Sequence, residues 1–566
     1  MQDVVPTPSG VSPGRAAWFS RLATRAHSAA PSLADCGVAI ASAALLIVSF
    51  PDFNLWPLAW FALIPLFVVL VRRPQSFRSF FLGWLFGTVF FYGSCYWLTY
   101  SMIHFGRIPR GLAFLLLLPG AVVMGIFPAI FAMVLARAIR KWGTAALFLA
   151  PLLWSALEWA RLETTGQLWN AIGYSQAYHP FLLQTASWGG VYAVGCLIVL
   201  VNSLLAYSLA KRSVPAFLTT AVGLAAVFGV ILVAALPAMI DVSSTLFSKP
   251  DVLVVAVQPN VPMEPISDPK TIEALITRHT LLSTTALQDW ERSGEPDNAV
   301  GMKDSDWAKD DSLTTRRAIP RLVVWPESPM NFTYGTDSLL RERLAAFAKA
   351  NHTAVLLNSQ EVAPNDGIYN SELLINEEGR LVSQYDKIRL LPFGEYVPLP
   401  QWMPGAGLIG AIVGDFTPGT NYRLMPVGNL RAGVFICIES AYPAIARRFT
   451  NEGADVLINI SNDGYLGPTA VMRQHLANAV FRAVENGRPL LRVTNTGITA
   501  FITPSGEIQD ATQSFKPEVR TWGTRGRNGR TFYTKHGDIF AAACAILSLL
   551  MFALSFRRIT GNAGAV

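Results

Sequence analysis

The chain has 566 residues, which is more than one ordinary domain needs and indicates at least two folding units. Apolar residues make up 52% of it and charged residues 15%, whereas a soluble protein usually carries about 25% charged residues, so the composition favours a membrane protein over a soluble one. The net charge of +7 does not indicate a nucleic-acid partner, because the basic residues lie in short clusters beside apolar segments.

Residues 1–34 are polar, and the apolar stretches that follow them are long enough to cross a membrane. Crossing about 30 Å of hydrocarbon requires roughly 20 helical residues. The pattern predicts eight transmembrane helices, near 36–53, 55–71, 79–100, 111–138, 144–160, 191–210, 217–240 and 538–556. We expect the first to be retained and not cleaved as a secretory signal, because a long polar segment precedes it and the second span follows almost at once.

Basic residues in the loops predict how these helices are oriented. They cluster after the second, fourth, sixth and eighth spans: Arg72, Arg73 and Arg78; Arg137, Arg140 and Lys141; Lys211 and Arg212; Arg557 and Arg558. Since Lys and Arg favour the cytoplasmic side, both termini are predicted to be cytoplasmic. The predicted organisation is a cytoplasmic segment 1–34, a membrane domain 35–240, an outer domain 241–537, and a last helix with a cytoplasmic C-terminus in 538–566.

Residues 241–537 change character and predict an α/β domain. Short β-branched runs that end in polar residues are typical of buried strands, and they occupy 251–260, 321–328, 353–360, 430–440 and 454–463. Segments 337–350 and 469–486 have helical spacing, and strands that alternate with helices favour a layered α/β architecture. The stretch 288–320 is acidic and has no period, so we expect a solvated insertion there.

Cys437 is the only cysteine in the predicted outer domain, whereas the other four fall in predicted spans: Cys36, Cys95, Cys196 and Cys544. A lone cysteine is often only a small buried apolar residue. Cys437, however, ends the apolar strand AGVFI and precedes a helix-like segment. A residue at such a strand-to-helix turn is exposed and lies near helix-end amides, which favour a thiolate. Cys437 is therefore a candidate nucleophile.

Charged residues follow apolar strands in two further segments. Glu327 comes directly after a strand and a Trp-Pro corner in VVWPES, and Lys387 and Glu395 lie in the Pro/Gly-rich loop YDKIRLLPFGEYVP. Standing alone, each would be an ordinary solvated loop residue. In the order Glu327, Lys387, Cys437, each at a strand end or in the following loop, they resemble the nitrilase, or carbon–nitrogen hydrolase, superfamily.

Longer motifs narrow the resemblance to the apolipoprotein N-acyltransferase family. They are WPES, DKIRLLPFGEYVP, ISNDGYLGPTAVMRQH and RAVENGRPLLRVTNTGITAFITPSGEI, and GYSQ at 173–176 is similar to the family's membrane part. The resemblance covers nearly the whole chain except the polar N-terminus and 288–320. It implies a membrane bundle of about eight helices, multi-pass in the cell inner membrane, joined to a periplasmic nitrilase-like α-β-β-α sandwich.

The resemblance also implies catalytic roles. Glu327 is the general base that takes the thiol proton, and Cys437 attacks an ester carbonyl and holds the acyl chain as a thioester. Lys387 stabilises the oxyanion, together with the backbone N–H of Ile438. Reaction would be ping-pong: a membrane glycerophospholipid donates the acyl chain, and the α-amino group of an S-diacylglyceryl apolipoprotein accepts it. No metal and no cofactor is expected, since the outer domain lacks closely spaced His/Cys ligand sets.

Two acidic positions, Glu395 and Glu439, match the family with less defined roles, and Tyr465 is a further candidate. Glu395 and Glu439 are expected to orient Lys387 and to shape the pocket, and Tyr465 is expected to contact substrate. The chain departs from the family's usual pattern at two of its positions: Ile438 stands where an aromatic residue often follows the cysteine, and Tyr465 stands where Trp is frequent.

Alternatives remain at this stage. A membrane-bound nitrilase-type amidase or hydrolase shares the same triad but passes the acyl group to water. A thiol hydrolase would pair Cys437 with His475. A transporter or receptor would use intramembrane charges, and Glu158 and Arg161 at the end of the fifth span are the nearest candidates, although they suit a lipid headgroup equally well.

Overall fold

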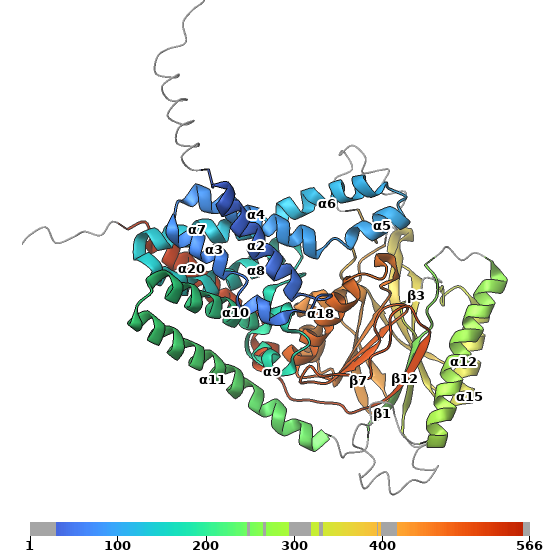
Figure 1. Cartoon of the computed structure of the whole chain (residues 1–566). Coiled ribbons are helices and arrows are strands. Elements are labelled where there is room, and N and C mark those ends of the chain that lie inside the picture. The colour runs from blue at the N-terminus through green and yellow to red at the C-terminus, as the bar shows by residue number, and fades with distance from the viewer. Residues whose placement is uncertain are drawn as a thin grey trace, which may run out of the picture.

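The computed structural model describes residues 30–245, 250–263, 268–293, 319–327, 332–392, 394–397 and 416–557. Most of the polar N-terminus and of the predicted insertion lies outside these residues. Figure 1 shows a helical part, formed by residues 30–245 and the last described helix, packed beside an α/β part.

The helical part consists of apolar helices joined by short connections. Its longer helices are α2 (Leu33–Ser49), α3 (Ile64–Arg72), α4 (Ser76–Ser94), α5 (Leu98–His104), α6 (Arg110–Met124), α7 (Ile126–Trp142), α8 (Ala150–Thr165), α10 (Ala186–Lys211), α11 (Val214–Thr245) and α20 (Ile539–Leu554). Shorter elements are η1 (Trp56–Trp60), η2 (Gly143–Leu149), η3 (Ile172–Gln176), α9 (Pro180–Leu183) and α19 (Phe532–His536). Helices therefore occur in or beside each of the predicted spans.

Helix length supports a membrane protein but does not confirm eight spans. Within the described residues, three helical stretches are long and apolar enough to cross a membrane: Arg110–Thr165, Ala186–Lys211 and Val214–Met239. The number becomes four if α4 and α5, which meet at a 52° bend, form one span. The first, second and last predicted spans correspond to apolar helices of fewer than 18 residues, namely Leu33–Ser49, Trp56–Arg72 and Ile539–Leu554.

Two six-stranded sheets form the centre of the α/β part. The first has the order β12-β1-β2-β3-β4-β5, with β1 (Val252–Gln258), β2 (Arg321–Val324), β3 (Ala354–Val362), β4 (Ile368–Ile375), β5 (Leu381–Asp386) and β12 (Glu518–Thr524). The second has the order β11-β10-β9-β8-β7-β6, with β6 (Leu424–Val427), β7 (Leu430–Ile436), β8 (Val456–Ser461), β9 (Leu490–Thr494), β10 (Ala500–Ile502) and β11 (Ile508–Gln509). The five predicted strands are among them.

Each sheet has three parallel strands at its centre, β1-β2-β3 and β7-β8-β9, flanked by antiparallel strands. Parallel strands are normally buried on both faces, which explains their continuous apolar runs. Because the side chains of neighbouring strand residues point to opposite faces, Val254 and Ala256 lie in the core that contains residues of the second sheet, whereas Leu253 and Val255 pack against the outer helices.

Helices cover the outer faces of both sheets, which confirms the predicted α-β-β-α sandwich. The first sheet carries α12 (Pro269–Ser293) and α15 (Ser338–Asn351), and the second carries α17 (Pro443–Glu452) and α18 (Val471–Asn486). The acidic insertion was predicted to begin at residue 288, but α12 continues to Ser293. Its last turns are held by the buried apolar side chains of Leu287 and Trp290.

Helix α18 joins the two parts of the molecule, since it lies between the second sheet and α10 (Figure 1). The Gln474 side chain at its start makes four hydrogen bonds to the helical part. Its oxygen accepts from the indoles of Trp97 (3.0 Å) and Trp169 (2.9 Å), and its amide donates to the carbonyls of Pro51 and Ser94 (both 3.1 Å). The α/β part is thus fixed to the apolar helices by a buried side chain.

Candidate active site

Cys437 lies at a sharp turn between β7 and α17. It is the first residue of the 3-10 turn η6 (Cys437–Ala441), and its φ of 53° falls in the left-handed region, which side chains with a Cβ seldom adopt. Such a conformation costs energy and persists only where the surroundings impose it. The predicted strand-to-helix turn is therefore present, and it presents a partly buried thiol.

Glu439 supplies much of that constraint. Its carboxylate is fully buried and accepts hydrogen bonds from the N–H groups of Ile436 (2.8 Å), Ile388 (2.8 Å) and Arg389 (3.0 Å) and from the hydroxyl of Tyr385 (2.9 Å). Burial raises the pKa of Glu439, and the amide bonds oppose that rise. The Glu439 side chain thus connects the Cys437 turn of the second sheet to the loop after β5 of the first sheet.

That loop carries Lys387, which is almost completely buried between two carboxylates. Its Nζ lies 2.8 Å from Oε1 of Glu395 and 3.5 Å from Oε1 of Glu327. Burial lowers the pKa of Lys387, but the two carboxylates outweigh it and hold the pKa well above its ordinary value. Lys387 is therefore a fixed cation, and Glu395 is its nearer carboxylate partner.

Glu327 follows β2 and is held from both sheets. Its Oε1 accepts from the amide of Asn370 (2.9 Å), which also donates to Glu395 (2.8 Å), and its Oε2 accepts from the backbone N–H of Asn462 (3.0 Å). Sequence reasoning missed both asparagines. Asn462 belongs to the quoted ISND motif, but nothing in the sequence singles out Asn370, which lies within β4.

Cys437, Lys387 and Glu327 interact electrostatically, so the structure brings the three predicted residues together. Burial raises the pKa of the Cys437 thiol above its ordinary value, the Glu327 carboxylate raises it further, and Lys387 opposes both effects. Burial and Glu327 therefore oppose the preference for a thiolate that the turn's helix-end amides are expected to give. A thiol in this environment needs a base to remove its proton, and Glu327 is the carboxylate with the largest electrostatic effect on it.

His475 lies beside the turn that carries Cys437, and the two described contacts of its ring do not include the thiol. Its Nδ1 is 2.8 Å from Oδ1 of Asp463, and its Nε2 is 3.0 Å from the backbone carbonyl oxygen of Cys437. Both ring nitrogens are occupied by these oxygens, so the geometry gives no support to a thiol hydrolase in which His475 is the base.

Tyr465 lies where η7 (Gly464–Leu466) meets α5. Its side chain is half exposed and packs edge-on against Phe105, with ring centroids 5.4 Å apart, and its carbonyl accepts from the Ser101 hydroxyl (2.6 Å). The same loop carries Asn462, whose N–H binds Glu327. One loop of the α/β part therefore contacts both the helical part and the predicted base. The side chain of Ile438, by contrast, is buried. Its predicted role needs only its backbone N–H, so this burial does not conflict with it.

Glu158 and Arg161, the two buried charges of the helical part that were candidates for a transporter or receptor, hold backbone in place. Glu158 accepts from the N–H of Ile172 (2.7 Å), and Arg161 donates to the carbonyl of Trp169 (2.9 Å). Both side chains are more than 90% buried, so they fix the segment before α9 and do not form an open headgroup site.

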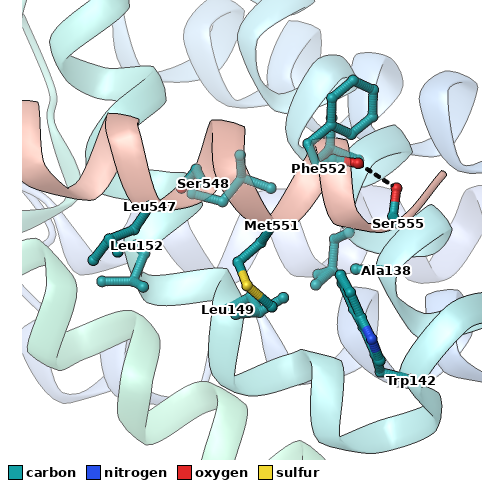
Figure 2. Close-up of a pocket in the computed structure, with 12 residues that line it drawn as sticks. Ala138, Trp142, Leu149, Leu152, Leu547, Ser548, Met551, Phe552 and Ser555 are labelled. Atoms are coloured by element: carbon teal, nitrogen blue, oxygen red, sulfur yellow. Dashed lines mark hydrogen bonds between the residues drawn. The ribbon is translucent and has the colours of Figure 1, made fainter. Parts of the chain in front are cut away.

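A pocket elsewhere in the molecule has a different character (Figure 2). It lies between α7, α8 and α20, and apolar side chains such as Leu152, Leu547 and Met551 line it. At one end the Ser555 hydroxyl donates to the Phe552 carbonyl (2.5 Å). No residue of the α/β part lines this pocket, and none of its lining residues is acidic, basic or a thiol.

Comparisons with known proteins identify the family of the chain. A family model described as the apolipoprotein N-acyltransferase N-terminal domain matches residues 42–204, and one described as carbon-nitrogen hydrolase matches residues 318–521. An apolipoprotein N-acyltransferase of Geobacter metallireducens is 31% identical over 532 residues, which cover 93% of this chain and 96% of that protein. The chain belongs to the apolipoprotein N-acyltransferase family. It is therefore an acyltransferase of lipoprotein N-acylation, carrying a carbon–nitrogen hydrolase domain, and a receptor or transporter is excluded.

A second apolipoprotein N-acyltransferase, from Azotobacter vinelandii, is 30% identical over 536 residues, 92% of this chain and 95% of that protein. Among solved structures, Saccharomyces cerevisiae Nit3 of the nitrilase superfamily covers 49% of this chain and 91% of its own, with 18% identity and a TM-score of 0.34. An amidase from Nesterenkonia sp. covers 52% and 97%, with 14% identity and a TM-score of 0.35. Within the described residues, no group of three or more His, Cys, Asp or Glu side chains has the arrangement of a metal site.

Proposed function

We propose that Cys437 takes an acyl chain from a membrane glycerophospholipid as a thioester and passes it to the α-amino group of an S-diacylglyceryl apolipoprotein. The observation that carries this proposal is the cluster of Glu327, Lys387 and Cys437 at strand ends of two facing sheets. Its attachment to apolar helices through Gln474 adds support, since both substrates are lipids or lipid-anchored.

In the first half-reaction Glu327 accepts the Cys437 thiol proton as the sulfur attacks the ester carbonyl. The resulting oxyanion faces the Lys387 ammonium and the backbone N–H of Ile438. The C–O bond then breaks, and Glu327 returns the proton to the departing lysophospholipid oxygen. The acyl chain is left on sulfur.

In the second half-reaction the amine of the apolipoprotein attacks the thioester carbonyl. Glu327 takes the proton that the amine loses, and the same two donors stabilise the new oxyanion. When the C–S bond breaks, the proton passes to the Cys437 sulfur and the amide product leaves. Glu395 keeps Lys387 oriented through both steps, because it shares the ammonium at 2.8 Å.

Intact mass spectrometry of the purified protein tests the intermediate. After exposure to a phospholipid of one defined acyl chain, the mass should rise by that acyl group, and hydroxylamine should remove it as expected for a thioester. Adding a diacylglyceryl-cysteine peptide should clear the adduct and yield N-acyl peptide. If free fatty acid forms instead, the enzyme is an amidase-type hydrolase.

We also propose that the helical part spans the inner membrane eight times and that residues 241–537 face the periplasm, with Tyr465 contacting lipid substrate. In a Cys437→Ala background, a cysteine at the exposed Glu378 should react with an impermeant maleimide in cells whose outer membrane alone is permeabilised. A cysteine at the exposed Lys211 is the matched control and should react only after the inner membrane is opened. The opposite pattern would reverse the topology.

A further inference from the structure

A ring of four buried side chains surrounds the backbone carbonyl of the nucleophile, and two of them contact it directly. The Cys437 carbonyl oxygen lies 3.0 Å from Nε2 of His475 and accepts from the amide of Asn459 (3.4 Å). Asp463 binds His475 (2.8 Å), and the Arg492 guanidinium donates both to Asp463 (2.7 Å) and to the Asn459 side-chain oxygen, which closes a ring. We call these four side chains the carbonyl clamp.

The carbonyl clamp is built from neighbouring elements of the second sheet. Asn459 lies on β8, Asp463 in the loop after it, Arg492 on β9 and His475 on α18. None of the four is more than 3% exposed, so water does not compete for the Cys437 carbonyl at this side. Burial alone would raise the pKa of Asp463, but Arg492 and His475 hold the pKa below its ordinary value, so a carboxylate closes the ring.

The grip on this carbonyl also fixes the next amide. The C=O of Cys437 and the N–H of Ile438 belong to one planar, trans peptide unit, so the two groups point in opposite directions. Holding the carbonyl toward the carbonyl clamp therefore aims the Ile438 N–H to the other side of the turn. As the second residue of η6, Ile438 has an N–H that the turn itself does not use.

We propose that His475 and Asn459 are positioning residues that aim the Ile438 N–H at the oxyanion through the Cys437–Ile438 peptide. This inference rests on the proposed function, in which that N–H stabilises the tetrahedral intermediate. A hydrogen bond accepted by a peptide carbonyl also polarises the N–H of the same peptide and makes it a stronger donor. The carbonyl clamp then acts on the transition state without touching the substrate, the thiol or the base.

Two rates measured on the full-length protein separate this role from others. Acyl-enzyme formation with a labelled phospholipid passes through an oxyanion, whereas alkylation of Cys437 by iodoacetamide does not. In His475→Leu, acyl-enzyme formation should fall by about 10- to 100-fold, which is below the effect of deleting an oxyanion donor. The alkylation rate should stay within about twofold of the wild-type rate at each pH.

Two further variants keep the test decisive. His475→Gln retains an N–H that can reach the Cys437 carbonyl and should recover most of the acylation rate. Asn459→Leu should show the same selective loss, but a smaller one, because its bond is longer at 3.4 Å. His279→Leu removes a histidine that is equally buried and that, among the described residues, bonds the Leu275 carbonyl and not the Cys437 turn, so it controls for loss of stability and should leave acylation unchanged.

Unchanged acylation in His475→Leu and Asn459→Leu would overturn the inference. So would alkylation that falls in parallel with acylation, since the carbonyl clamp would then be holding the thiol itself. If wild type forms no acyl-enzyme, the proposed function fails. If wild type forms it and only the selectivity is missing, this inference alone fails.

Discussion

The two sides of the active site are built on different principles. On the first sheet, Glu327, Lys387 and Glu395 form a chain of charged contacts, with 2.8 and 3.5 Å between the ammonium and the two carboxylates. On the second sheet, no side chain among the described residues forms a hydrogen bond or ion pair with the Cys437 sulfur. Its surroundings act on its backbone instead, through Glu439 on one side and the carbonyl clamp on the other.

The two sheets therefore have different tasks in this site. A charge on the first sheet moves protons or stabilises charge, so its removal should change chemistry while the fold survives. A contact on the second sheet sets the direction of a backbone group, so its removal should change geometry or stability. The site is completed where both meet, because the N–H of Asn462 after β8 binds Glu327 after β2.

Removing the nucleophile is expected to have the largest effect. Cys437→Ala should abolish acyl-enzyme formation and N-acylation, because no other group can carry the acyl chain. The matched controls are Cys36→Ala, Cys95→Ala, Cys196→Ala and Cys544→Ala, all in the helical part, which should keep near wild-type rates. N-acyl peptide formed by Cys437→Ala at a substantial rate would end the thioester mechanism.

Removing charge from the first sheet should come next. Glu327→Gln keeps the shape but cannot accept a proton, so thioester formation should fall about 10²- to 10⁴-fold. Lys387→Met should lose about 10²- to 10³-fold through the missing oxyanion charge. The double variant should be far from additive, because both residues serve one transition state.

Single-turnover kinetics with labelled phospholipid measure these losses. Glu378→Gln and Lys349→Met change the same charges at exposed positions and should leave the rate unaltered. A Glu327→Gln enzyme that acylates at the wild-type rate would place the base elsewhere.

Two buried glutamates give a direct comparison of the two sides. Glu439 accepts four bonds from backbone and Tyr385, whereas Glu395 pairs with the Lys387 ammonium. Glu439→Gln should lower stability by about 2–4 kcal/mol, because its new N–H₂ faces donors. Glu395→Gln should lose less stability and more of the acylation rate. Thermal unfolding and the acylation rate, measured on both variants, test this prediction. Equal losses of stability and of rate in the two variants would contradict it.

Much of the site could be predicted from local sequence, because its charged residues interrupt apolar strands. Glu327 and Cys437 lie at strand ends, where a polar residue has no packing role, and the order with Lys387 matches a known superfamily. Asn370 could not be predicted, because its role depends on the pairing of β3, β4 and β5, and Gln474 could not, because its partners lie more than 300 residues away. Periodicity reports which face is buried, not which distant side chain meets it.

The fold shows the same division. The strands and helices with strong patterns were predicted, including β1, β3, β7, β8, α15 and α18. The raised pKa of Cys437 was not predicted, because the turn alone favours a thiolate. The burial and the Glu327 carboxylate that raise the pKa come from the assembled sheets.

The smallest expected effect, with the sharpest sign, concerns alkylation of Cys437. Its pKa is raised, so the thiol form dominates at the ordinary thiol pKa and the iodoacetamide rate should still be climbing as pH passes that value. Glu327→Gln removes a charge that raises the pKa, so its profile should shift to lower pH and its rate at pH 8 should rise about three- to tenfold. Lys387→Met removes a charge that lowers the pKa and should shift the profile to higher pH. Glu327→Gln should thus alkylate faster while it acylates more slowly, and a thermal unfolding curve like that of wild type is needed to exclude loss of folding, which would also expose the thiol. Slower alkylation in Glu327→Gln would mean that its carboxylate does not act on the Cys437 thiol through charge.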